Sequence, residues 1–375
     1  MAEFLQLMEN WDGQVPLGST PVNEAAVARV IDLLANKDRL PRHKHEYLLK
    51  EVITTSDFPT LFGVAIDREM LANYRANLGD WRPYTKVSRL PNFNTHERHK
   101  VFGQDNLLPR VVEKGEYPVG KAATGHYDLQ LKKYGRQFDI SWEAIINDSM
   151  GAFADLATRF ATAAQRTVSR TATSLYAVAA GTNPLLYGAP IVDNGQNVTN
   201  LGGLTLTAAN LQTTLSLMAA QTDPNGEPIA VRGVHLVVPP QLEFTARAIL
   251  TSSLVTWTNV VAAAVPMPTT NVMSQLGIQL HVDPFLPVID TTDGDTTWYV
   301  FADPSQGASI EMAFLTGYED PEICMKASDK VALGGFGGLS PFSGDFATDN
   351  VFYRVRMVVD GCQLDPRYTY AQDGG

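Results

Sequence analysis

One long amphipathic segment constrains this chain more than any other feature. Between Trp142 and Ala180 the apolar residues recur at steps of three and four, the spacing that places side chains on one helical face. The apolar stripe consists of Met150, Phe153, Leu156, Phe160, Ala164, Val168, Ala172, Leu175 and Ala179. From Met150 to Ala179 such a helix would extend about 45 Å at 1.5 Å per residue. We therefore expect a backbone helix that organises the rest of the fold and ends at Gly181.

The remaining periodicity predicts a mixed α+β protein. Residues 207–220 and 241–253 have helical spacing, and Phe62, Ile66, Met70 and Tyr74 form a further helical stripe. Strands are expected in VHLVVPP, in GIQLHVDPFL, in TTWYVFADP and in SIEMAFLTGY. The final strand, NVFYRVRMVVDGCQL, alternates Val351, Tyr353, Val355, Met357 and Val359 with the residues between them. The order of these elements shows no internal repeat.

Composition excludes several classes of protein. Hydrophobic residues make up 45% of the 375 residues and charged residues 18%, which excludes intrinsic disorder as the default state. The apolar runs are far shorter than the roughly 18 residues of a membrane helix, and the acidic start MAEFLQLMENWDGQ does not resemble a signal peptide. We expect a soluble protein kept in a cytoplasm. Cys324 and Cys362 are expected to be two small buried hydrophobes rather than a disulfide.

The charge of the chain is unevenly distributed. The total is 29 basic and 40 acidic residues, a net charge of −11, which argues against a sequence-specific DNA-binding protein. Residues 82–136, however, hold eleven Lys and Arg against five Asp and Glu. This segment has strand-like runs around Arg110–Glu113 and in HYDLQLKKYGRQFDIS, but too few apolar residues for a core. We expect a long antiparallel excursion that lies on an acidic surface, such as that of a neighbouring copy.

No motif in the sequence predicts an active site, a cofactor or a metal. GEYPVGKA, residues 115–122, lacks the terminal hydroxyl and the following helix of a phosphate-binding loop, which favours a turn. In HERH the two histidines are three residues apart instead of four, which with His43 and His45 favours a solvated basic surface. The loop with Asp290, Asp293 and Asp295 lacks the closing Glu of a calcium loop, so we expect a solvated hairpin tip. GGFGGLSPFSG lacks GxSxG and is expected to be a loop.

Several blocks of sequence resemble the major capsid proteins of tailed phages. The blocks are ITTSDFPTLFGVAIDREMLANY, YGRQFDISWEAIINDSMGAF, VHLVVPPQLEFTARAIL, TTWYVFADPSQGASIEMAFLTGYEDPEI and RMVVDGCQLDPR. Together they cover about residues 53–367, and YGRQFDISWEAIIND is the most specific. The subgroup that they resemble is the Mu-like head subunits associated with a prohead protease.

The resemblance implies the Hong Kong 97-type capsid fold, an α+β fold, and a division of the chain into named parts. These are an N-terminal arm (1–54), a P-domain (55–84 and 137–204, spine helix about 148–180), an E-loop hairpin (85–136), an A-domain (205–305), and a return to the P-domain sheet with the C-terminal tail (306–375). The E-loop would lie across a neighbour's P-domain, where Lys100, Arg110, Lys114 and Lys121 would meet acidic patches at about 0–1 kcal/mol per exposed pair.

The function implied is assembly rather than catalysis. Copies would form pentamers and hexamers and close into an icosahedral head that encloses double-stranded DNA without specific contacts. Further partners would be a scaffold or protease, the portal and a decoration protein, with no membrane and no cofactor. The protein would be part of the virion and would assemble in the bacterial host cytoplasm.

Three other readings of the sequence stay open at this point. The first is an encapsulin-like nanocompartment shell, which a neighbouring cargo gene would favour. The second is an enzyme with a phosphate pocket near Lys121, which loss of nucleotide binding in Lys121→Ala would support. The third is a tail-tube protein, although tube subunits are usually shorter and less helical.

Overall fold

The computed structural model describes the chain in segments that fall into two compact units. The described residues are 67–68, 70–76, 79–102, 110–114, 123–141, 150–188, 190–193, 196–223, 226–252, 254–257, 267–326, 345–348 and 350–374. Unit 1 contains residues 1–78, 133–166 and 318–358, and unit 2 contains residues 79–132, 167–317 and 359–375. The expected arm 1–54, His43 and His45, residues 115–122 and the glycine-rich loop 334–344 lie outside the described residues.

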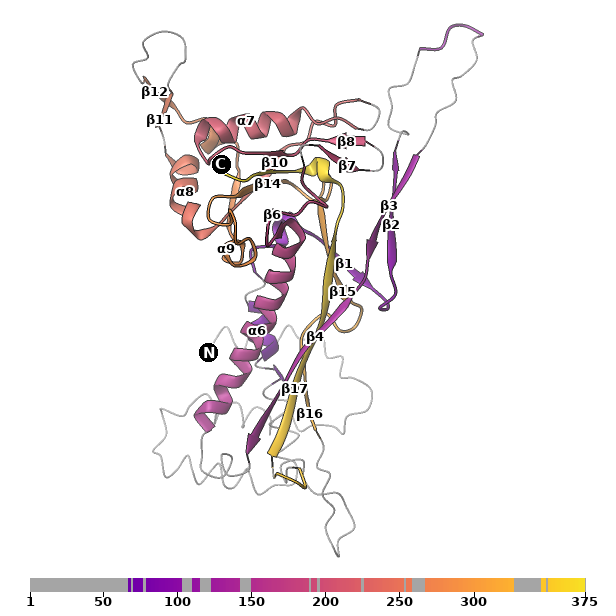
Figure 1. Cartoon of the computed structure of the whole chain (residues 1–375), viewed down its shortest axis with the longest axis vertical. Helices are drawn as coiled ribbons and strands as arrows, with labels where there is room; N and C mark the ends of the chain where they lie inside the picture. The colour runs from indigo at the N-terminus through magenta and orange to yellow at the C-terminus, as the bar shows by residue number, and fades with distance from the viewer. Residues whose placement is uncertain are drawn as a thin grey trace, which may run out of the picture. The chain divides into compact units, whose positions relative to one another are not determined.

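The long helix is present, and it belongs to both units. Helix α6 spans Met150–Tyr176, within the residues expected for it, and the chain then turns into the short strands β5 and β6 (Figure 1). Its apolar stripe is buried from Ala164 to Leu175, with Ala164, Val168 and Ala172 at 6% exposure or less, and Phe160 is half-buried. The helix ends before Gly181, and Ala179, the last residue of the expected stripe, is exposed. Among the described residues, no helix is both long and apolar enough to cross a bilayer.

Unit 2 is built on a five-stranded sheet whose spatial order is β13-β10-β14-β18-β9. The strands are β13 (Gln279–Val282), β10 (Gly233–Val238), β14 (Trp298–Ala302), β18 (Thr369–Gln372) and β9 (Leu201–Gly202). Strand β14 pairs antiparallel with both β10 and β18, whereas β13 pairs parallel with β10. Every residue of β14 is buried, because the sheet is covered on both faces.

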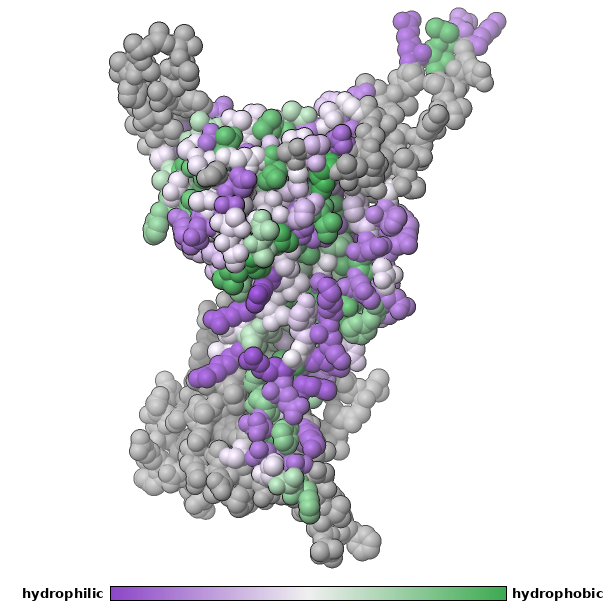
Figure 2. Space-filling view, in the orientation of Figure 1, coloured by the Kyte–Doolittle hydropathy of each residue, from purple (hydrophilic) through white to green (hydrophobic). Residues whose placement is uncertain are grey.

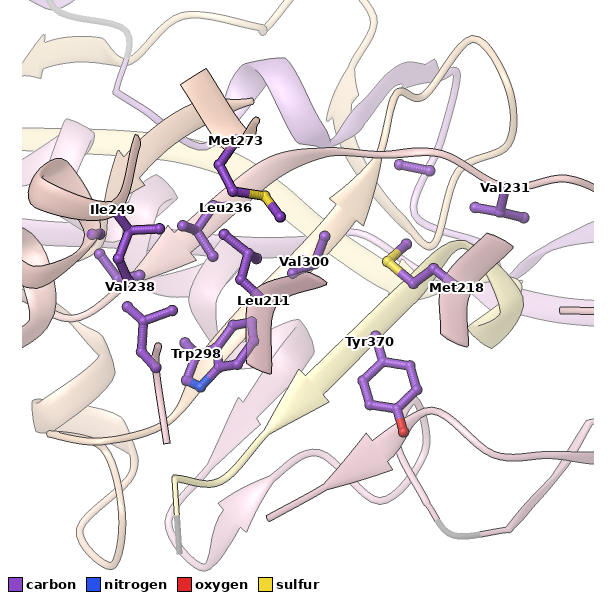
Figure 3. Close-up of a cluster of buried hydrophobic side chains, with 13 residues drawn as sticks. Leu211, Met218, Val231, Leu236, Val238, Ile249, Met273, Trp298, Val300 and Tyr370 are labelled. Carbon is purple, nitrogen blue, oxygen red and sulfur yellow. The ribbon is translucent and has the colours of Figure 1, made fainter. Parts of the chain in front are cut away.

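Two helices cover one face of this sheet and form the main core of unit 2. Helix α7 (Ala208–Ala219) starts at Thr207, whose side chain accepts a hydrogen bond from the Asn210 N–H, and α8 is Glu243–Thr251. Figure 3 shows apolar side chains from these helices and from β10 and β14 directed toward one another. The cluster includes Leu211, Met218, Leu236, Val238, Ile249, Met273, Trp298, Val300 and Tyr370.

The opposite face of the β14 sheet carries an aromatic cluster. Tyr84, from the 3₁₀ turn η1 (Arg82–Tyr84), stacks on Phe301 at 4.9 Å between ring centroids. Tyr176, at the end of α6, meets Tyr299 edge-on at 4.9 Å. Strand β14 therefore directs Trp298 and Val300 to one core and Tyr299 and Phe301 to the other, as the alternation of a strand requires.

Each unit also contains pairs from a second group of strands. In unit 2, β1 (Lys86–Leu90) pairs parallel with β15 (Ile310–Leu315), which pairs antiparallel with the end of β17 (Asn350–Gln363). In unit 1, β17 pairs antiparallel with β16 (Glu322–Met325) and also pairs with β4 (Lys132–Ser141). The alternation predicted for β17 is confirmed from Val351 to Met357, whereas Val358, Val359 and Asp360 are all buried.

Unit 1 packs α6 and a short helical stretch at residues 70–76 against these strands. Met70 and Tyr74 are buried there, as the stripe predicts, while Phe62 and Ile66 lie outside the described residues. The amide of Gln165 on α6 donates to the carbonyls of Asn73 (3.0 Å) and Tyr74 (3.1 Å). On the strand side, Phe138 of β4 stacks on Tyr353 at 5.1 Å and also contacts Phe160 of α6 at 4.6 Å.

The remaining described elements are short. They are β5 (Ala177–Val178), β6 (Gly181–Thr182), β7 (Ile191–Asp193), β8 (Gln196–Val198), η2 (Pro240–Leu242), β11 (Leu254–Trp257), β12 (Met267–Thr270), η3 (Met273–Gln275), α9 (Leu286–Ile289) and η5 (Pro366–Tyr368). Cys324 and Cys362 are both free thiols, half-buried and buried respectively.

Two expectations about strands are wrong. The run 110–113 is not a strand. The antiparallel partner of β3 (Ala123–Leu129) is instead β2 (His96–Phe102), which contains the HERH segment. HYDLQLKKYGRQFDIS is two strands, because β3 ends at Leu129 and β4 pairs with β17. The first five residues of HERHKVF are all polar, so the segment lacks the alternation of apolar and polar residues that predicts a strand, and histidine and arginine are not among the residues enriched in strands.

The acidic loop is not a hairpin tip. Strands β13 and β14 both pair with β10 and not with each other, and α9 lies between them. Asp290 is 1% exposed, and its Oδ1 accepts hydrogen bonds from the N–H groups of Thr292 (2.9 Å) and Asp293 (3.0 Å). The first aspartate of this loop therefore holds a turn at the end of α9 instead of facing solvent.

Candidate inter-subunit surface

The β2–β3 hairpin lies within the basic segment, residues 82–136. The two strands pair antiparallel over seven positions, from His96 opposite Leu129 to Phe102 opposite Ala123 (Figure 1). Figure 2 shows hydrophilic residues gathered over the region of these strands. Because paired residues share a face of a two-stranded ribbon, the hairpin has two chemically different faces.

The inner face of the hairpin is tied to a buried carboxylate on β15. Arg98 approaches Glu311 with its Nε at 2.9 Å and its Nη2 at 2.7 Å from Oε1, and Lys86 Nζ lies 3.3 Å from Oε2. The Glu311 side chain is fully buried, while the side chains of Arg98 and Lys86 are 30% and 50% exposed. Arg98 also donates to the Ser88 hydroxyl at 3.3 Å. A single carboxylate thus joins β1, β2 and β15.

Electrostatics explain how this carboxylate stays ionised. Burial alone would raise the pKa of Glu311, because desolvation penalises the charged form. Hydrogen bonds from Ser88 and Arg98, together with the charges of Lys86 and Arg98, outweigh burial and hold the pKa below its ordinary value. Glu311 is therefore the anionic centre of a charged cluster at the base of the hairpin.

A second ion pair lies where the chain leaves the hairpin. Lys132, at the start of β4, places its Nζ 2.8 Å from Asp360 Oδ2, and the Asp360 side chain is only 9% exposed. In the β15–β17 register, Asp360 lies opposite Ala313 and Cys362 lies opposite Glu311. Glu311 and Asp360 therefore project from the same face of this strand pair. Glu311 thus binds Lys86, which precedes the hairpin, and Asp360 binds Lys132, which follows it.

The outer face of the hairpin has a different composition. Glu97 lies opposite Asp128 and His99 lies opposite His126, and all four residues are exposed. His99 Nε2 is 3.5 Å from Glu97 Oε2. Two carboxylates directly across a strand pair repel each other, which costs stability unless a cation lies nearby.

The four residues expected to make inter-subunit contacts lie in different surroundings. Lys100 is in β2 opposite Gly125. Arg110 and Lys114 are exposed, and Lys114 adopts a left-handed backbone conformation with φ of 60°. Lys121 lies outside the described residues. Their contact with a neighbour stays a prediction.

Sequence reasoning missed the Arg98–Glu311 pair. The two residues are separated by 213 positions, so no local pattern connects them. The available signal was the single acidic residue within the apolar run IEMAFL, every residue of which is buried. A charge in a fully buried strand needs a partner, and the nearest basic segment was a candidate source.

A second buried polar cluster lies under the aromatic face of unit 2. Asp283 accepts hydrogen bonds at Oδ2 from the hydroxyls of Thr173 (2.5 Å) and Tyr176, and at Oδ1 from the Phe285 N–H (2.8 Å). Burial raises the pKa of Asp283, although these hydrogen bonds oppose the rise. Both carboxylate oxygens are used by the fold, so Asp283 joins α6 to the end of β13 and is not a free acid or base.

Two histidines lie beside this cluster on neighbouring strands. His235 Nδ1 and His281 Nε2 are 3.0 Å apart, and both side chains are buried. Burial, and then the neighbouring His235, lower the pKa of His281 to about 4, and burial also lowers the pKa of His235. Within the described ranges, no group of three or more His, Cys, Asp or Glu side chains is arranged to hold a metal ion.

Comparison with known proteins decides what kind of molecule carries these features. Residues 127–372, about two-thirds of the chain, match the model of a family described as phage capsid protein. The chain belongs to the phage capsid protein family. No curated protein matches it. The α+β capsid fold predicted from the sequence is confirmed, and the protein is a major capsid shell protein, a structural component of the virion that assembles with copies of itself.

Several solved structures are similar to this capsid protein at low sequence identity. The capsid of an empty GTA particle has 11% identity and a TM-score of 0.45, covering 79% of this chain and 89% of that one. The Gordonia phage Cozz structure has 13% identity and a TM-score of 0.44, covering 77% and 84%. The SrpI encapsulin from Synechococcus elongatus has 10% identity and a TM-score of 0.44, covering 77% and 85%.

Proposed function

We propose that this capsid protein assembles through pentamers and hexamers into an icosahedral phage head that encloses double-stranded DNA. The family match over residues 127–372 carries the proposal. The net charge of −11 supports an inner wall that has little net attraction for DNA, so that the genome does not condense onto the shell. Assembly would take place in the bacterial host cytoplasm, with a scaffold or protease, a portal and a decoration protein as partners.

The division into capsid domains is part of the same proposal. We assign residues 85–136 to an E-loop, 205–305 to an A-domain, and 55–84 with 137–204 to a P-domain whose spine is α6. The remaining parts are the N-terminal arm, 1–54, and the segment 306–375 that returns to the P-domain sheet. The hairpin β2–β3 supports the E-loop assignment, because Arg98 within it binds Glu311 and Lys132, which follows it, binds Asp360.

The inter-subunit residues and the subgroup are also proposals. Lys100, Arg110, Lys114 and Lys121 would contact acidic patches on a neighbour, and the exposure of Arg110 and Lys114 is compatible with that role. The blocks YGRQFDISWEAIIND and VHLVVPPQLEFTARAIL support assignment to the Mu-like subgroup associated with a prohead protease.

Electron microscopy with light scattering on the purified chain tests the proposal. Closed shells tens of nanometres across, or discrete pentamers and hexamers, are the expected result. Particles from infected cells should contain double-stranded DNA, whereas shells that enclose a protein cargo would favour an encapsulin-like compartment. A chain that stays monomeric at high concentration and with crowding agents would overturn the proposal.

A further inference from the structure

A buried carboxylate oxygen in the loop after α9 has no partner among the described residues. Asp290 is 1% exposed, and its Oδ1 accepts hydrogen bonds from the N–H groups of Thr292 and Asp293. Its Oδ2 is shielded from solvent and accepts no hydrogen bond, and no basic side chain in the described part of the chain forms an ion pair with it. Because buried charges in proteins are paired or bind a metal, this oxygen requires a positive ligand.

A second buried group without a partner lies on strand β14. The Tyr299 side chain is fully buried, and its hydroxyl makes no hydrogen bond within the described residues. Burial, then the neighbouring Tyr187 and then the charge of Asp290 raise the pKa of Tyr299, so this hydroxyl lies within the electrostatic reach of the Asp290 carboxylate. A hydroxyl and a carboxylate, both buried and both without a partner, therefore belong to one region of unit 2.

The end of α6 brings this loop and β14 together. Thr291, which follows Asp290, binds the Ala179 carbonyl through its N–H (3.3 Å) and its hydroxyl (2.9 Å). Tyr176, three residues before Ala179, meets the Tyr299 ring edge-on at 4.9 Å between centroids. Helix α9 also contacts β5, which lies between Tyr176 and Ala179 in the chain. The loop and Tyr299 thus lie against the same stretch of chain.

The atoms available in this loop are oxygens. Asp293 is half-buried, its N–H lies 3.0 Å from Asp290 Oδ1, and its carboxylate has no hydrogen-bond partner within the described residues. Gly294 returns the chain onto the end of α9 so closely that an added Cβ would collide with the carbonyl oxygens of Asp290 and Leu286. Calcium binds carboxylate, carbonyl and water oxygens in a flexible geometry, so it suits such a loop better than magnesium does.

We propose that Asp290, Asp293 and Tyr299 form a site for one calcium ion in unit 2. Asp290 Oδ2 is the buried ligand, Asp293 closes the site on the solvent side, and the Tyr299 hydroxyl approaches from the sheet. Backbone carbonyls and water take the other positions. Two carboxylates and a tyrosine hydroxyl are compatible with the absence, from the described residues, of a cluster of three or more His, Cys, Asp or Glu side chains. The ion would hold the α9–β14 loop in place, and this role does not depend on the proposed function.

Calcium titration of the full chain, after treatment with EDTA and dialysis, tests the site. Isothermal titration calorimetry with CaCl₂ measures the affinity, and thermal melting of the unassembled subunit measures stability. Asp290→Asn keeps an oxygen for the two N–H bonds but removes the charge, and Tyr299→Phe removes only the hydroxyl. Asp295→Asn is the matched control, because Asp295 is exposed in the same loop and accepts a hydrogen bond from Gln241 at 2.6 Å. Circular dichroism shows whether each variant is folded.

The unmodified protein and Asp295→Asn should each bind one calcium ion per subunit at this site. CaCl₂ at about 100 times its Kd should raise the melting temperature by about 5 °C or more. Asp290→Asn should weaken binding by at least about tenfold, and Tyr299→Phe should weaken it by about threefold to tenfold. In EDTA, Asp290→Asn should melt at or above the temperature of the unmodified protein, because the unpaired buried charge is gone. In calcium this order should reverse.

Four outcomes would overturn the inference. The first is the absence of a calcium-dependent heat or melting shift in the unmodified protein, the result expected if a water molecule alone bridges Asp290 and Tyr299. The second is an equal calcium response in folded Asp290→Asn, which would assign the binding to other acidic residues. The third is an unchanged affinity in Tyr299→Phe, which also decides the matter if Asp290→Asn does not fold. The fourth is an equal melting shift with NaCl at the same ionic strength.

Discussion

Replacing Glu311 by Gln should destabilise the subunit more than any other single carboxylate-to-amide change around the hairpin. Glu311 is fully buried and accepts from Arg98 at 2.7 and 2.9 Å, with Lys86 at 3.3 Å. Breaking a fully buried ion pair by removing one partner costs about 3–5 kcal/mol. Because the side chains of Arg98 and Lys86 are 30% and 50% exposed, water can solvate them in the variant. We therefore expect a loss of about 2–3 kcal/mol in the free energy of unfolding.

Urea unfolding of the unassembled subunit, followed by tryptophan fluorescence, measures this loss. Trp81 is a suitable reporter, since it is 4% exposed and its ring lies 6.3 Å from that of Phe314 on β15. Glu97→Gln is the matched control, because Glu97 is exposed on the same hairpin, and it should change stability by less than about 0.5 kcal/mol. Arg98→Met should cost clearly less in the Glu311→Gln background than alone, because its partner is already gone.

The pH dependence of the effect gives an independent check. The pKa of Glu311 is lower in the folded protein than its ordinary value of 4.5, so its contribution is complete above that value and is lost as the pH falls through the folded pKa. The difference between the unmodified protein and Glu311→Gln should therefore shrink on acidification. A variant within about 0.5 kcal/mol of the unmodified protein at pH 7, or additive effects of the Arg98 and Glu311 changes, would refute the reasoning.

Three further changes test other parts of the structure. Burial raises the pKa of Asp67 to about 6, so the folded protein loses stability as the pH rises from about 4 to 6. Asp67→Asn should therefore raise the free energy of unfolding by up to about 3 kcal/mol at pH 8 and by little at pH 4, measured by urea unfolding. Burial lowers the pKa of His281 to about 4, so the folded protein loses stability as the pH falls from the ordinary value of 6.5 toward 4. His281→Gln, which can keep a hydrogen bond to His235, should reduce this acid-induced loss in the free energy of unfolding by up to about 3 kcal/mol. An unchanged pH profile of stability would contradict this. A Cβ on Gly361 would lie 2.6 Å from both Leu175 Cδ1 and the backbone oxygen of Glu311. Gly361→Ala should therefore destabilise the fold by about 1–3 kcal/mol and lower the melting temperature by several degrees. An unshifted melting temperature would show that β17 can move away from α6 without cost.

Local periodicity was sufficient for the elements that bury a single continuous face. The stripe from Met150 predicted α6, and the alternation from Val351 predicted β17, because one face of each element packs on a core while the other faces away. Where both faces are buried, as in β14, the apolar run TTWYVFADP was also sufficient. These features depend on the residues within one element, so they can be read from the chain in order.

The partner of each charged side chain could not be read in that way. Arg98 was assigned to a solvated surface, but it is bound to a carboxylate 213 positions away. Asp290 was expected at an exposed tip, but it is buried and caps a turn. In both cases local sequence shows only the charge, while desolvation and pairing are decided by which strands lie next to each other.

The amino-acid sequence by itself determined the long helix and the strands of the cores, because hydrophobic burial acts on residues a few positions apart, and its sequence blocks indicated the capsid family. Only the tertiary structure decided which face of the β2–β3 hairpin holds Arg98 bound to Glu311, and which face exposes Glu97 and Asp128. The pleat of a strand sends neighbouring residues to opposite sides, and the position of Glu311 on β15 determines which side turns inward. A charge count over residues 82–136 averages the two faces, and for that reason it indicated a basic surface where the described outer face carries carboxylates.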